Sequence, residues 1–204
     1  EIAYTTDAPY LSLIHDFAER YDVPITYASG GPPDKTRPGR ALMGLLRWIT
    51  SGFEGADFVG LCQARLLHFS GVEMAEGHRV PLSFEVATLL RLARVGRGRL
   101  DYRNGLQRLE YELVGQRREA ETHGKARGRL EAQLELIEPT GRIIDALFEL
   151  IPGRRSIALC ELTGACWTFL THYAAVEGDL DREAIVGLRQ HLTNIGEYVE
   201  ISAA

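Results

Sequence analysis

Apolar residues recur at helical spacing along most of this 204-residue sequence, and this pattern limits the chain to a mainly helical fold. Pro139 lies inside the longest periodic stretch, which predicts either a kink or two separate helices there. Ser83 is predicted to cap the helix that follows it. The predicted helices cover residues 9–21, 41–49, 53–69, 84–95, 106–114, 117–150, 156–176 and 181–195.

The first thirty residues follow a different pattern. Short runs typical of strands at residues 1–4 and 23–27 flank the first helix, and Gly30-Gly31-Pro32-Pro33 then breaks regular structure. We therefore predict a small α/β element over residues 1–35 and a helical bundle over residues 36–204. Since the sequence begins at Glu1, without an initiator methionine, we expect it to be an excised piece of a larger protein.

Composition favours an ordinary soluble domain. The chain is 45% apolar and 25% charged, and it contains no apolar stretch long enough for a bilayer span. Its first residues lack the basic and apolar regions that are typical of a signal peptide. Its three cysteines are too few and too irregularly spaced for a disulfide framework or a zinc site. We expect them to behave as small buried hydrophobes in a reducing, cytoplasmic protein.

Positive charge is concentrated in one segment. Residues 91–130 hold eleven Lys and Arg against five Asp and Glu, whereas the whole chain has a net charge of −5. Arginine forms bidentate contacts with phosphate, so this segment is a candidate DNA-binding region, although solvated helices often carry such runs. Tyr102 and Tyr111 are candidates for stacking on bases. The spacing of Tyr111 with Leu106, Leu109 and Leu113 is also compatible with a place in the core. The candidate residues are Arg94, Arg97, Arg99, Arg103, Arg117, Arg118, Lys125 and Arg127.

The sequence does not predict a catalytic site, a metal site or a cofactor. Neither Gly30-Gly31 nor Gly96-x-Gly98 has the residues that a nucleotide-binding loop requires, and the six histidines are scattered singly. The acidic pairs Asp179 with Asp181 and Glu110 with Glu112 lack the context of a metal-dependent nuclease. His172 is interpreted as a hydrogen-bonded core residue, which makes a free-standing hydrolase the least favoured function.

The N-terminal quarter resembles a known family. Glu1-Ile2-Ala3-Tyr4, the helix ending Phe17-Ala18-Glu19-Arg20-Tyr21, Val23-Pro24-Ile25-Thr26-Tyr27 and the helix Arg40 to Ile49 are together similar to superfamily 1 helicases of the UvrD and RecB type. There, a strand and helix of the second RecA-like domain lead into an inserted helical subdomain. The closest likeness is to AddB-like subunits of helicase–nuclease repair proteins, which carry a PD-(D/E)XK nuclease nearer their C-terminus.

This resemblance implies a role in processing DNA ends during recombinational repair. The family's nucleotide-binding loop and nuclease motif have no counterparts here, so no catalytic residue is carried over, and helicase or exonuclease activity would belong to the parent protein. We expect a non-catalytic helical subdomain that shapes a DNA path or braces its neighbours. Its partners would be DNA and other domains of the same polypeptide or a helicase subunit, with no membrane contact. The alternative is a protein–protein interaction module.

Overall fold

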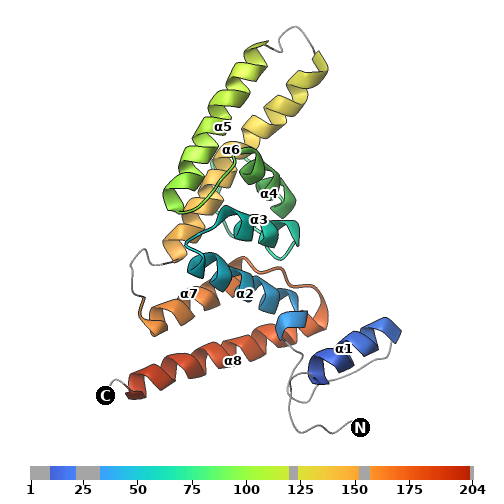
Figure 1. Cartoon of the computed structure of the whole chain (residues 1–204), viewed down its shortest axis with the longest axis vertical. Coiled ribbons are helices and arrows are strands. Elements are labelled where there is room, and N and C mark those ends of the chain that lie inside the picture. Colours follow the sequence, from blue (N-terminus) through green and yellow to red (C-terminus); the bar gives the residue numbers. More distant parts are fainter. Residues whose placement is uncertain (1–9, 22–32, 120–123, 152–156, 203–204) are drawn as a thin grey trace.

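A computed structural model describes residues 10–21, 33–119, 124–151 and 157–202 (Figure 1). The described part is 76% helix and contains no sheet, which confirms the predicted mainly helical class. The predicted strands at residues 1–4 and 23–27 lie outside the described residues, and the domain boundary after residue 35 stays a prediction. The helices are α1 (Tyr10–Tyr21), α2 (Arg37–Thr50), α3 (Gly55–Gln63), α4 (Ser83–Leu92), α5 (Arg99–Glu119), α6 (Gly124–Leu150), α7 (Leu159–His172) and α8 (Gly178–Ser202), with a 3-10 turn η1 at Pro33–Lys35.

Helix α3 is much shorter than predicted. It ends at Gln63 instead of continuing to residue 69, and Arg65 takes a left-handed conformation with φ of 53°. The backbone beyond it pairs with the segment after α7: the His68 amide donates to the Tyr173 carbonyl at 2.8 Å, and the Ala175 amide donates to the Leu66 carbonyl at 2.8 Å. These long-range bonds replace the helical ones, and periodicity alone could not reveal them.

The predicted helix over residues 117–150 is divided between two helices. Residues 117–119 form the last turn of α5, and α6 then runs from Gly124 to Leu150 as one helix that includes Pro139. The prediction of separate helices at Pro139 is therefore wrong. A proline inside a helix removes one backbone hydrogen bond. Tight packing compensates for that loss, because Ile137, Ile143 and Ile144 on either side of it are buried.

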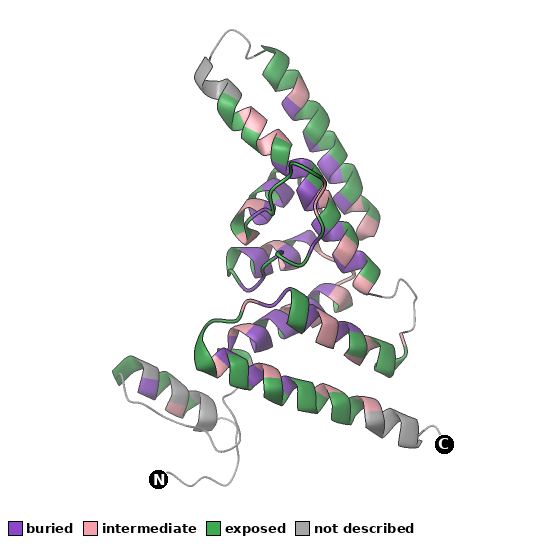
Figure 2. Ribbon diagram, turned by 180° about the vertical axis from the view of Figure 1, so that it is seen from behind, coloured by how far each residue is buried: buried purple, intermediate pink, exposed green. Residues whose placement is uncertain are grey.

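The helices are stacked in layers below a projecting pair. Figure 1 shows α8 at one end of the molecule, α7 and α2 above it, α3 and α4 above these, and the antiparallel helices α5 and α6 extending away from the rest. Buried residues gather where these layers meet, and the outer turns of α5 are mostly exposed (Figure 2). We call the α5–α6 pair the arm; its base contains the first turns of α5 and the last turns of α6.

Four aromatic side chains join α2 and α3 to the base of the arm. Trp48 of α2 is fully buried and lies against Phe58, Tyr102 and Phe148, with ring centroids 4.9–5.9 Å away. Its indole N–H donates to the Tyr102 hydroxyl at 2.7 Å, so the buried polar atoms satisfy each other. Burial raises the pKa of Tyr102 well above its ordinary value. The phenol therefore stays neutral.

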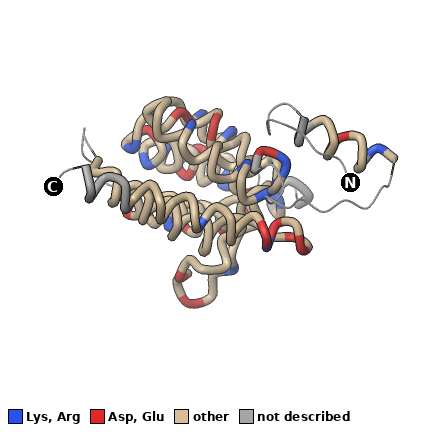
Figure 3. The backbone as a smooth tube through the Cα atoms, turned by 90° about the horizontal axis from the view of Figure 1, so that it is seen from below, with Lys and Arg blue, Asp and Glu red and all other residues tan. Residues whose placement is uncertain are grey.

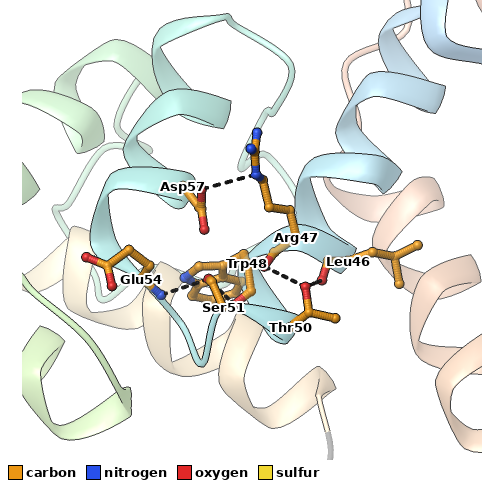
Figure 4. Close-up of polar contacts among 7 residues, drawn as sticks. All are labelled: Leu46, Arg47, Trp48, Thr50, Ser51, Glu54 and Asp57. Atoms are coloured by element: carbon orange, nitrogen blue, oxygen red, sulfur yellow. Dashed lines mark hydrogen bonds and ion pairs between the residues drawn. The ribbon is translucent and has the colours of Figure 1, made fainter.

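The corner between α2 and α3 holds Trp48 in place. Figure 4 shows Ser51, which donates to the Trp48 carbonyl at 3.1 Å and accepts from the Glu54 amide at 3.3 Å. Arg47 and Asp57 form an ion pair across the same corner at 3.7 Å. The corner also needs Gly52, because its φ of 73° favours glycine.

A buried carboxylate connects the start of α2 to the start of α8. Asp181 is 5% exposed and accepts from the Arg37 amide at 3.0 Å and from the Glu177 amide at 2.8 Å. Thr36 caps α2 beside it by accepting from the Gly39 amide at 3.2 Å. Both bonds to Asp181 are charge-assisted and satisfy amides that a helix terminus leaves without partners.

Helix α1 lies apart from the layers, beside η1 (Figure 1). An ion pair between Lys35 and Asp16 at 2.6 Å connects it to the rest of the described chain, and Ala18 is buried. Leu13, Phe17 and Tyr21 are about 60% exposed and follow one another at intervals of four residues. They form an apolar stripe along α1.

Candidate nucleic-acid interface

The arm carries most of the predicted DNA-binding residues and divides them into two groups. Helix α5 has 21 residues, so at 1.5 Å per residue it is about 30 Å long. Arg94, Arg97, Arg99 and Arg103 lie at or near the base of the arm. Arg117 and Arg118 lie at its far end, which we call the tip, with Lys125 and Arg127 in the first turn of α6. The structure does not bring the eight residues together into one site.

Arg99 has a structural role at the base. Its guanidinium donates to the carbonyl oxygens of Phe148 at 3.0 Å and Ile151 at 2.5 Å, at the C-terminal end of α6. It also lies 5.1 Å from the ring centroid of Phe53 and 5.0 Å from that of Phe148. Burial lowers its pKa. These intramolecular contacts use donors that a phosphate would need, so we assign Arg99 a structural role and not a DNA contact.

Two other arginines near the base, Arg97 and Arg103, also contact the protein, whereas the side chain of Arg94 is exposed. The Arg97 guanidinium covers Gly52, where a Cβ would lie 2.8 Å from its Nε. Arg103 pairs with Asp145 at 3.5 Å. Arg94 is exposed and has a left-handed backbone with φ of 50°, which ends α4.

A groove between α5 and α6 begins at the base and has a volume of about 530 Å³. Arg103 and Arg142 line it, but so do Glu110, Glu138 and Asp145. Arg142 pairs with Glu138 within the groove. Because the acidic side chains that line the groove balance the charge of the basic ones, the groove lacks the positive potential that attracts a polyanion.

The tip has an excess of positive charge. Residues 117–130 contain five Lys and Arg against two Asp and Glu. Arg117, Arg118 and Arg129 are exposed. Lys125 and Arg127 belong to α6, but their side chains lie outside the described part. Over the body of the molecule, by contrast, acidic residues lie in groups as well as beside basic ones (Figure 3). The tip is therefore the strongest candidate surface for phosphate.

The two tyrosines of the basic segment have different environments. Tyr102 is fully buried in the aromatic core, whereas Tyr111 is 82% exposed. Nine residues correspond to about 2.5 turns of helix, so the two side chains leave α5 on opposite faces. The interpretation that Tyr111 belongs to the core is wrong, and the buried ring of Tyr102 is not available to stack on bases.

The acidic pairs and His172 do not form a catalytic site. Asp181 is occupied by two backbone amides, Asp179 pairs with Arg182, and Glu110 and Glu112 project from α5. The described residues contain no group of three or more side chains that could hold a metal ion. His172 is exposed and contacts Thr168 and Thr171 of its own helix, so its prediction as a core residue is wrong.

The cysteines are all free thiols. Cys62 and Cys166 are buried as predicted, and burial raises their pKa values to about 12 and about 11. Cys160 is exposed, against the prediction, because it lies in the first turn of α7 on the side away from the core. The two buried thiols stay protonated and unreactive at neutral pH.

No family model matches the sequence, and neither the curated proteins nor the solved structures include a significant match. The resemblance of residues 1–49 to helicases of the UvrD and RecB type therefore stays a prediction. Among the described residues, no helix combines the length and the apolar character needed to cross a membrane. The case for a function consequently depends on the geometry of the arm.

Sequence reasoning missed two features of this surface. Arg108, which belongs to the basic segment, donates to the Ala93 carbonyl at 2.8 Å and thereby fixes α5 to the end of α4. No sequence signal indicates this contact. The exposure of Tyr111 could be predicted from its position in the sequence. Tyr111 follows Leu109 by two residues, which turns its side chain about 200° around the helix from that of Leu109.

Proposed function

We propose that this chain is a non-catalytic helical accessory module of a DNA-processing protein of the helicase–nuclease-like repair type, and that its arm contacts DNA. The observation that carries the proposal is the arginine-rich tip, exposed at the far end of a projecting helix pair. The parent would supply any helicase or nuclease activity. The free thiols suit a reducing, cytoplasmic setting.

Charge supports DNA as the ligand. Arginine offers five donors in a planar fork that matches phosphate, and four of the five basic residues at the tip are arginine. Outside residues 91–130 the chain is strongly acidic, so a polyanion is repelled from that part and attracted to the tip. The module would therefore hold DNA at a distance from its own core.

The construction of the base supports a bracing role. Arg99 connects α5 to the end of α6, and the Gly55 amide donates to the Gly96 carbonyl at 2.6 Å. The Gly98 amide donates to the Phe53 carbonyl at 3.2 Å, which connects the loop before α5 to the corner after α2. An arm held in this way would keep its tip at a defined position relative to neighbouring domains.

Reversing two charges at the tip tests the contact with DNA. Replacing Arg117 and Arg118 together with glutamate is expected to weaken binding to duplex DNA by about tenfold or more at low salt. The slope of log affinity against log salt concentration is expected to fall by about 2, because each lost phosphate contact removes about 0.9. Fluorescence anisotropy titrations over a salt series measure both quantities.

The matched control reverses two exposed arginines away from the arm, Arg20 and Arg65, which changes the net charge equally. Its affinity and salt slope are expected to stay close to those of the unmodified chain. An equal loss in the control would mean that net charge, not the tip, governs binding. A chain that binds no DNA at low salt would reject the proposal.

The apolar stripe on α1 favours a second function, docking of another domain of the same polypeptide or of a helicase subunit. Leu13, Phe17 and Tyr21 are exposed together, and the tilted rings of Phe17 and Tyr21 contact each other with centroids 4.5 Å apart. Contiguous exposed apolar residues of this kind mark contact surfaces.

Replacing Leu13 and Phe17 with serine tests this function. If the stripe is an unprotected contact surface, the unmodified chain is expected to self-associate as its concentration rises, and the double variant is expected to remain monomeric. Size-exclusion chromatography with light scattering measures the mass of both. Identical monomeric profiles at high concentration would count against the stripe as a contact surface.

A further inference from the structure

Tyr111 is exposed on the arm, and the proposed binding of duplex DNA at the tip gives its side chain no role. Its side chain is 82% exposed and projects from the face of α5 opposite to Tyr102. The buried residues of α5 are Tyr102, Gly105, Leu106, Leu109 and Leu113, all on the other side. An aromatic ring exposed to this degree contributes little to the core, so it is free to contact a ligand.

The face around Tyr111 has the composition of a surface for nucleic acid. Arg118 follows Tyr111 by seven residues, which places it about two turns further toward the tip on the same side of α5. Gly115 lies between them, and a Cβ there would meet no atom within 4 Å. An exposed ring and an exposed guanidinium are thus separated by open helix surface.

Acidic residues flank this face without occupying it. Glu110 and Glu112 are the immediate neighbours of Tyr111, and each is turned by about 100° to one side of it. Glu110 points into the groove between α5 and α6. The line from Gln107 through Tyr111 to Arg118 therefore contains no carboxylate, which leaves the ring open to an anionic ligand.

We propose that Tyr111 is a stacking platform for the bases of a single-stranded nucleic acid whose phosphates lie against Arg118 at the tip of the arm. The inference rests on the proposed function and deepens it by naming the substrate class. Single-strand-binding proteins pair an electropositive surface with exposed aromatic rings, because an unpaired base has a free π-face. In a duplex the bases are already stacked on each other, so Tyr111 contributes little to duplex binding.

The test compares three labelled probes: oligothymidine, an oligonucleotide of the same length with abasic sites, and a matched duplex. Tyr111→Ala is expected to lower the affinity for oligothymidine by about 5- to 150-fold and to bring it to the level of the abasic probe. Duplex affinity is expected to stay within about twofold. Tyr111→Phe keeps the ring and is expected to retain oligothymidine binding.

Leu100→Ala is the matched control, since Leu100 is 74% exposed on α5 but lies at the base of the arm. It is expected to bind all three probes like the unmodified chain. Oligouridine with the same dependence on Tyr111 would also support the inference, because base stacking does not distinguish the two backbones.

The outcomes separate the two proposals. Unchanged oligothymidine binding in Tyr111→Ala, together with weakened binding after reversal of Arg117 and Arg118, would overturn the stacking role and leave the DNA contact in place. Equal affinity of the unmodified chain for oligothymidine and for the abasic probe would also overturn it. Failure of every probe to bind would reject both.

Discussion

Replacing Trp48 with alanine is expected to lower the free energy of unfolding by about 3–5 kcal/mol, the range for large aromatic residues in a packed core. Trp48 is fully buried and contacts aromatic rings from α3, α5 and α6, so its removal opens a cavity where all these elements meet. Urea denaturation followed by circular dichroism measures the change.

Tyr102→Phe is the companion variant. It keeps the ring and removes the hydroxyl that accepts from Trp48, which leaves a buried indole N–H without a partner. The expected cost is about 1–3 kcal/mol, clearly below that of the cavity. A loss under about 1 kcal/mol for Trp48→Ala would show that the layers of the fold do not depend on this cluster.

Arg99→Ala is expected to destabilise the chain by about 2–3 kcal/mol, although Arg99 lies in the segment predicted to bind DNA. The substitution removes two hydrogen bonds from a charged donor to the carbonyls of Phe148 and Ile151, and it uncovers two aromatic rings. Thermal unfolding and urea denaturation both report this loss. DNA affinity at low temperature is expected to change little, because the guanidinium faces the protein.

Arg103→Ala provides the comparison, since Arg103 is four residues away and forms an exposed ion pair at 3.5 Å. Its expected effect on stability is below about 1 kcal/mol. Arg99→Lys keeps the positive charge but removes the planar guanidinium group. It is therefore expected to recover less than half of the stability that Arg99→Ala loses. Equal effects of Arg99→Ala and Arg103→Ala would contradict the structural role of Arg99.

The sequence predicted the helical class because apolar spacing repeats along whole helices, and it placed α1 and α4 within a few residues of their observed positions. It failed where the outcome depends on long-range contacts. The segment after Gln63 leaves the helix to pair with residues beyond α7, more than 100 positions away. Pro139 was predicted either to kink a helix or to divide it in two, and α6 runs through it as one helix.

The candidate site was predictable in composition and not in geometry. Charge counting found the basic segment, yet residues alike in sequence have different roles: Arg99 and Arg108 bind backbone carbonyls, and Arg118 is exposed. Side-chain type cannot separate these roles, because they depend on which helix passes nearby. One geometric feature could be predicted: the side of α5 from which Tyr111 projects, since it follows from residue numbers alone.

Asp181 connects the beginning of the helical bundle directly to its last helix. The carboxylate accepts from an amide 144 positions earlier, so the first and last parts of the layered region are in direct contact. A contact of such large sequence separation forms late in folding, because the intervening chain must first be ordered. The beginning and the end of the bundle are therefore expected to unfold as one cooperative unit, and loss of α8 would also release the start of α2.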